Sequence, residues 1–176
     1  GQEVQDTFDF VAQKSAARGC RAQAQVAGIS FDMVCNGTCD GIDPATGQQA
    51  TACAKNIAIG DNCRNGNPEG PIDFTKCEKL SPTGLYRVAV NDYIAAGGSG
   101  FVVLKRNTSQ QNTGISLRDS LTVYLQKQAA MCDGMTTDQI MDDTDPTKTV
   151  QAKYGNVSCL DDKIEAHDGR IRPVYE

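Results

Sequence analysis

Residues 86–101, YRVAVNDYIAAGGSGF, are the most informative stretch of the chain. Apolar residues alternate with polar ones ahead of Tyr93, which predicts a strand over residues 85–92 that ends at an aromatic side chain. Three glycines at positions 97, 98 and 100 permit positive φ angles and a close approach of the backbone to a ligand. An aromatic ring just before such a turn can serve as a stacking surface. On spacing alone, a tight turn after a core strand is the simpler interpretation.

The rest of the chain predicts an α+β fold, in which helices pack on a mixed sheet. Apolar residues recur with a helical period over residues 2–17, and Gly19 is expected to end that helix. Residues 21–34 are typical of a strand with a bulge at Gly28. The remaining expected elements are strands at 56–60, 101–104 and 170–175 and a helix at 115–125, for which Ser116 is the expected N-cap.

Five stretches, in the same order, resemble the C-terminal domain of the 5'-nucleotidase family. Residues 86–101 are similar to the family's strand, Asn, aromatic residue and Gly-Gly-Asp-Gly-Phe/Tyr motif. The other four are residues 1–10 (the opening helix), 25–31 (Gln-Val-Ser/Gly-Gly-Leu/Ile), 113–125 (the helix after the glycines) and 169–171 (Gly-Arg-Ile). Residues 35–55 and about 130–165 lie outside the resemblance. It implies that residues 1–176 are a single, partial 5'-nucleotidase C-terminal-like domain with a Cys-rich insertion at about 35–82.

The resemblance also implies a nucleotide site. In the family this domain holds the nucleoside part of the substrate, and the base lies between two aromatic rings. Tyr93 matches the second ring, while the family's first ring and its phosphate-side arginines lie upstream of the matching helix. Ser99 replaces an Asp that accepts ribose hydroxyls, and a neutral serine should bind them more weakly. The expected substrate-binding residues are Asn91, Tyr93, Gly97, Gly98, Ser99, Gly100 and Phe101.

We expect no catalytic centre and no cofactor in this chain. The family's chemistry resembles two-metal phosphoester hydrolysis, which needs clustered Asp, His and Asn ligands. The chain has one histidine, His167, in a polar stretch, and none of the family's metal motifs. Divalent metals are expected in a missing N-terminal part of the same protein. This chain would then be the substrate-binding part of a phosphoesterase, with a nucleotide or nucleoside-like small molecule as its ligand.

Eight cysteines, even in number and widely scattered, favour disulfides and an oxidising compartment, here secreted or periplasmic. Zinc is the rival interpretation, but zinc sites usually carry closer pairs than Cys35 and Cys39. We expect all eight cysteines to be paired, with Cys63–Cys77 and Cys132–Cys159 as two of the disulfides. The eight are Cys20, Cys35, Cys39, Cys53, Cys63, Cys77, Cys132 and Cys159.

Charge and hydropathy exclude two classes of partner. The net charge of −5 and the isoelectric point of about 4.9 disfavour nucleic-acid polymers. No apolar run approaches the length of a membrane span. The alternative function is a disulfide-stapled extracellular binding or structural module that has lost nucleotide binding. Ser99 and the Cys-rich stretch favour that alternative.

Overall fold

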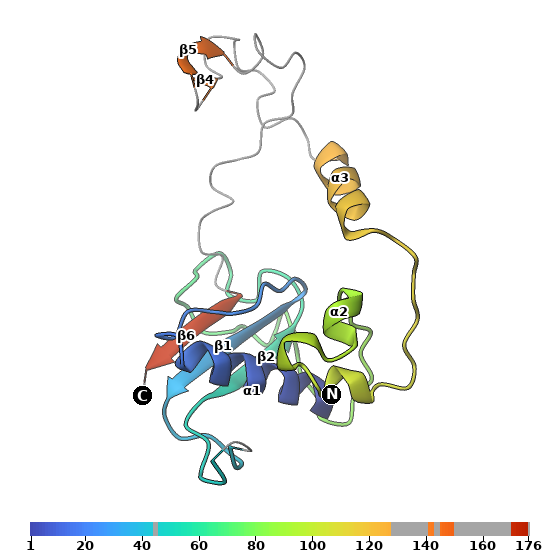
Figure 1. Cartoon of the computed structure of the whole chain (residues 1–176). Coiled ribbons are helices and arrows are strands. Elements are labelled where there is room, and N and C mark those ends of the chain that lie inside the picture. The colour runs from blue at the N-terminus through green and yellow to red at the C-terminus, as the bar shows by residue number, and fades with distance from the viewer. Residues whose placement is uncertain (44–45, 128–140, 143–144, 150–169, 176) are drawn as a thin grey trace. The chain divides into compact units, whose positions relative to one another are not determined.

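The computed structural model describes residues 1–43, 46–127, 141–142, 145–149 and 170–175 (Figure 1). Its contacts form two units, Gly1–Gln111 with His167–Glu176, and Asn112–Ala166. The first unit contains α1 (Gln2–Ala16), β1 (Ile29–Asn36), β2 (Cys53–Ile59), β3 (Glu78–Lys79), α2 (Asp92–Ala95), the 3-10 turns η1 (Gly98–Gly100) and η2 (Leu104–Arg106), and β6 (Ile171–Tyr175). The second contains α3 (Leu117–Lys127), β4 (Met141–Asp142) and β5 (Asp145–Thr149).

A mixed four-stranded sheet with the order β3-β2-β1-β6 forms the centre of the first unit. β2 runs antiparallel to β1 and β3, whereas β6 runs parallel to β1. α1 lies across β1 and β2 (Figure 1). The expected α+β class with a mixed sheet and helices is therefore confirmed. In the second unit, β4 and β5 pair as a separate antiparallel hairpin.

The sheet has a packed face under α1. Side chains of a strand alternate between its two faces, and Phe31 and Met33 of β1 share a buried cluster with Val11 and Ala12 of α1. The Phe8 and Phe31 rings lie 4.7 Å apart between their centroids. The helix that the apolar period predicts over residues 2–17 is confirmed almost to the residue.

The opposite face of β1 carries a buried carboxylate, Asp32. Its Oδ1 accepts hydrogen bonds from Arg64 Nη2 at 2.6 Å and from Arg172 Nε at 2.9 Å. Its Oδ2 accepts one from Asn56 Nδ2 at 2.8 Å. Burial alone would raise the pKa of Asp32, but the bonds from Asn56, Arg172 and Arg64 outweigh it and hold that pKa below its usual value. We call these four residues the Asp32 cluster.

Three disulfides hold the connections of this unit. The pairs are Cys20–Cys35, Cys39–Cys53 and Cys63–Cys77, so the last of these is confirmed as predicted. Cys132 and Cys159 lie outside the described residues. The Cys-rich stretch at 35–82 contributes β2 and β3 to the sheet.

The strand expected at residues 85–92 is wrong. Residues 85–91 have no regular secondary structure and form no ladder within the described part of the chain, and Leu85 is fully exposed. One edge on which a further strand could pair, the outer edge of β2, is already occupied at Ala54. Asp9 and Gln5 of α1 bond its backbone N–H and C=O. The strand expected at 101–104 is wrong as well: the chain turns there into η2, and only Val103 is buried.

The strand expected at 21–34 begins only at Ile29, so Gly28 lies ahead of the strand and the bulge expected there is wrong. A bulge forms on β2 instead. Asn56 and Ile57 together oppose Phe31, between the pairs Ser30–Ala58 and Asp32–Lys55. Asn56 adopts a φ of 54°, a left-handed conformation that asparagine tolerates. The bulge brings the Asn56 amide onto Asp32.

Replacing Arg64 by Met tests the Asp32 cluster. Removing one partner of a buried ion pair leaves the other charge undercompensated, so the free energy of unfolding should fall by about 3 kcal/mol. Urea denaturation of the oxidised protein measures the change. The exposed Arg87→Met is the matched control and should stay within about 0.5 kcal/mol of the parent. An equally small loss for Arg64→Met would contradict the role given to the cluster.

Candidate functional site

The residues expected to bind a nucleotide are neighbours in space because one compact turn contains all of them. Asn91 is the N-cap of α2: its Oδ1 accepts a hydrogen bond from the backbone N–H of Ile94 at 2.8 Å. N-cap asparagines satisfy an unpaired N–H of the first helical turn. The cap starts α2 at Asp92 and sets the direction in which Tyr93 leaves the backbone.

The Tyr93 ring lies over the glycines that follow it. Its side chain is exposed to 62%. A Cβ at Gly98 would come within 2.5 Å of the Tyr93 backbone oxygen and 2.6 Å of the Tyr93 ring, so the turn leaves no room for a side chain at this position. The backbone N–H of Ser99 donates a hydrogen bond of 3.2 Å to the Tyr93 hydroxyl. Hydrogen bonds from Ser99, from its side chain first, lower the pKa of Tyr93, and the Lys14 charge acts in the same direction.

The turn itself depends on left-handed backbone conformations. Gly97 and Gly100 have φ angles of 88° and 89°, and Ser99 has a φ of 54°. Glycine adopts such angles without strain, whereas serine rarely does. The turn continues into Phe101, whose ring meets the Phe10 ring edge-on at a centroid distance of 5.0 Å. All seven expected residues therefore lie in or beside one exposed turn.

Two residues of α1 that the sequence did not single out hold this turn. Lys14 Nζ donates a 2.8 Å hydrogen bond to the Ser99 carbonyl. The same ammonium lies 5.4 Å from the ring centroid of Phe10 and 5.8 Å from that of Phe101. The sequence did carry one signal for this contact. Phe10 and Lys14 are four positions apart on α1, so they are neighbours on the helix surface, and they lie off its apolar face.

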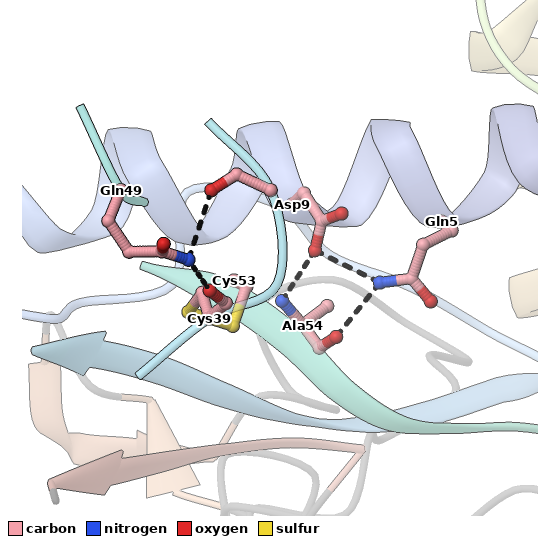
Figure 2. Close-up of a disulfide and its surroundings, with 7 residues drawn as sticks. Gln5, Asp9, Cys39, Gln49, Cys53 and Ala54 are labelled. Atoms are coloured by element: carbon pink, nitrogen blue, oxygen red, sulfur yellow. Dashed lines mark hydrogen bonds between the residues drawn. A yellow bond between two sulfur atoms is a disulfide. The ribbon is translucent and has the colours of Figure 1, made fainter. Parts of the chain in front are cut away.

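α1 is itself fixed to the sheet by a backbone contact, which Figure 2 shows beside the Cys39–Cys53 disulfide. Asp9 Oδ1 accepts the N–H of Ala54 at 2.8 Å, and Gln5 Nε2 donates to the Ala54 C=O at 2.9 Å. Gln5 also donates to Asp9 at 3.0 Å. The two side chains thus replace a neighbouring strand at this edge of β2.

The chemistry available at the turn is that of recognition. An exposed aromatic ring, exposed backbone and a nearby ammonium can stack on a flat ligand and bond to its polar edge. Among the described residues there is no group of three or more His, Cys, Asp or Glu side chains placed to hold a metal ion. His167 lies outside them. Arg172 of β6 lies away from the turn and pairs with Asp32.

In the part of the chain that the structure describes, no helix has both the length and the apolar character needed to cross a membrane. A separate shallow hollow lies between Gln13, Ala16 and the Ala50–Ala52 stretch, and it includes none of the turn residues. Comparison with protein-family models, with curated proteins and with solved structures finds no match for this chain.

Asp9→Asn should stabilise the protein at neutral pH relative to the parent. Burial raises the pKa of Asp9 above its usual value, against the hydrogen bonds from Ala54 and Gln5. The stability that protonated Asp9 contributes is therefore present below about pH 3.9, the pKa of an unfolded Asp. This stability is lost as the pH rises through the raised pKa of Asp9 in the folded protein. Asparagine keeps the acceptor oxygen without the charge, so its advantage should grow between pH 4 and pH 7.

The control for this test is Asp9→Ala, which leaves the Ala54 N–H without its acceptor and should cost about 1–3 kcal/mol at either pH. Urea unfolding at pH 4 and at pH 7 measures the free energy of unfolding of the parent, Asp9→Asn and Asp9→Ala. If Asp9→Asn were as unstable as Asp9→Ala, the hydrogen bond from the Ala54 N–H to the side chain at position 9 would not stabilise the contact between α1 and β2.

Proposed function

We propose that this chain is the nucleotide-binding part of a secreted or periplasmic phosphoesterase of the 5'-nucleotidase kind. The observation that carries the proposal is the exposed Tyr93 ring over a glycine turn. The order of motifs around that turn resembles the same family. The base would stack on Tyr93, and the exposed edge of the turn at Ser99 would face the ribose. Hydrolysis would take place in another part of the protein, where divalent metals are expected.

The disulfides support the compartment in this proposal. Three pairs within the described residues indicate an oxidising environment. Secretion or a periplasmic location would provide that environment, and both fit an enzyme that recovers nucleosides from external nucleotides.

Tyr93→Ala tests the stacking role directly. Adenosine added to the 176-residue chain at millimolar concentration should shift the backbone amide signals of residues 97–100 in NMR spectra. We expect the dissociation constant to be no tighter than about 1 mM, because one aromatic face contributes only about 1–3 kcal/mol. Tyr93→Ala should weaken binding at least about fivefold, and its stability should change by less than about 1 kcal/mol because the ring is exposed.

Tyr124→Ala is the matched control, since Tyr124 is exposed to 58% but lies on α3, outside the turn. It should bind adenosine like the parent. A large loss of stability with unchanged adenosine binding in Tyr93→Ala would identify Tyr93 as a core residue and contradict the proposal.

The chain alone should hydrolyse none of AMP, UDP-glucose or a cyclic nucleotide in the presence of zinc, manganese or cobalt. A phosphoester transition state needs its charge neutralised by metal ions or arginines, which we place in another part of the protein. The assay measures phosphate or nucleoside release. Turnover that survives further purification and disappears with a substitution in this chain would overturn this assignment.

The second candidate is a disulfide-stapled extracellular module without nucleotide binding. Ser99 favours it, because no charged acceptor stands at that point of the turn. Under this candidate the amides of residues 97–100 would not respond to adenosine in any variant. The adenosine titration therefore separates the two.

A further inference from the structure

We propose that Lys14 and Phe10 of α1 are positioning residues that hold the glycine turn, and with it Tyr93, in its ligand-binding conformation. This inference rests on the proposed function for its consequence, but the positioning itself can be measured without a ligand. We call Phe10, Lys14, Ser99, Gly100 and Phe101 the turn anchor.

The turn contains a strained residue that needs support from its surroundings. Ser99 has a φ of 54°, in a region that a serine adopts only when its surroundings impose it. The Ser99 carbonyl accepts a hydrogen bond of 2.8 Å from the Lys14 ammonium. A charged donor makes a stronger hydrogen bond than a neutral one. Lys14 therefore supplies a contact that favours the unusual conformation of Ser99.

The turn also packs against aromatic rings on the α1 side. A Cβ at Gly100 would come within 2.7 Å of Phe10 Cζ, so the backbone at Gly100 rests directly on this ring. Phe101 meets the same ring edge-on. Lys14 Nζ lies within 6 Å of both ring centroids, at 5.4 and 5.8 Å, the range of cation–π attraction. The ammonium and the two rings thus fix the turn from the α1 side.

Ser99 and Gly98 connect the turn to Tyr93. Once Ser99 is fixed, its N–H is directed at the Tyr93 hydroxyl, with a separation of 3.2 Å. Gly98 lies against the ring from the same turn. A turn released from α1 would lose this hydrogen bond and leave the ring free to rotate. The free protein would then hold the stacking surface in the binding orientation for a smaller fraction of the time, and the apparent affinity would fall in proportion.

The ionisation of Tyr93 reports the position of the turn without any ligand. In the parent, hydrogen bonds from Ser99 and then the Lys14 charge lower the pKa of Tyr93. ¹³C-tyrosine NMR, with the signal assigned by Tyr93→Phe, follows this titration. Lys14→Met should move the pKa of Tyr93 up towards its ordinary value. Lys14→Arg, which keeps the charge and the donor, should stay close to the parent.

Phe10→Leu separates positioning from the direct effect of charge. It leaves the Lys14 ammonium in place and removes only the ring under Gly100. An upward movement of the Tyr93 pKa in this variant supports the anchor, because no charge has changed. Lys79→Met, an exposed lysine on β3, is the control for loss of one positive charge and should leave Tyr93 unchanged.

Adenosine titration of the same variants measures the consequence. Lys14→Met and Phe10→Leu should each bind adenosine about threefold to tenfold more weakly than the parent. Lys14→Arg and Lys79→Met should bind adenosine as the parent does. If the Tyr93 pKa and adenosine binding are both unchanged in Lys14→Met and Phe10→Leu, the positioning role is overturned. If the Tyr93 pKa moves in both but adenosine binds to no protein, parent included, the positioning role is supported and the proposed function fails.

Discussion

Asp32 imposes the constraint on which the rest of the first unit depends. A carboxylate buried in a strand is costly unless charged donors reach it. Those donors come from Arg64, in the disulfide-closed stretch after β2, and from Arg172 of β6. Both arginines also donate to the Gly70 carbonyl. One carboxylate therefore joins three segments that are far apart in the sequence.

The position of the glycine turn follows from this arrangement through α1. With Asp32 facing Arg64, the alternation of β1 directs Phe31 and Met33 to the other face, where they pack on Val11 and Ala12. Asp9 and Gln5 then fix α1 along the strand at Ala54. Lys14 and Phe10 project from the same helix onto the glycine turn. The anchored turn is thus tied to the sheet by side chains of α1.

Sequence patterns predicted the elements that depend on nearby residues of the chain. They missed the elements and contacts that depend on residues far away in the sequence. The helix at α1 follows from its apolar period, and the short disulfide loop from Cys63 and Cys77. The alternating residues 85–92 have the pattern of a strand, yet a strand also needs a neighbouring edge to pair with, and side chains of α1 occupy one such edge at Ala54. Tyr93 and the glycines were identified from residue types, whereas Lys14 and the Asp32 cluster arise from tertiary contacts. An Asp within the apolar stretch of β1 was one trace of that cluster in the sequence.

The most direct test of nucleotide binding at the glycine turn is a search for intermolecular nuclear Overhauser effects between adenosine and the isotope-labelled chain. We expect contacts from the adenine H2 and H8 protons to the Tyr93 ring, and from the ribose protons to residues 97–100. Overhauser effects confined to protons elsewhere in the chain, with none to Tyr93, would contradict it.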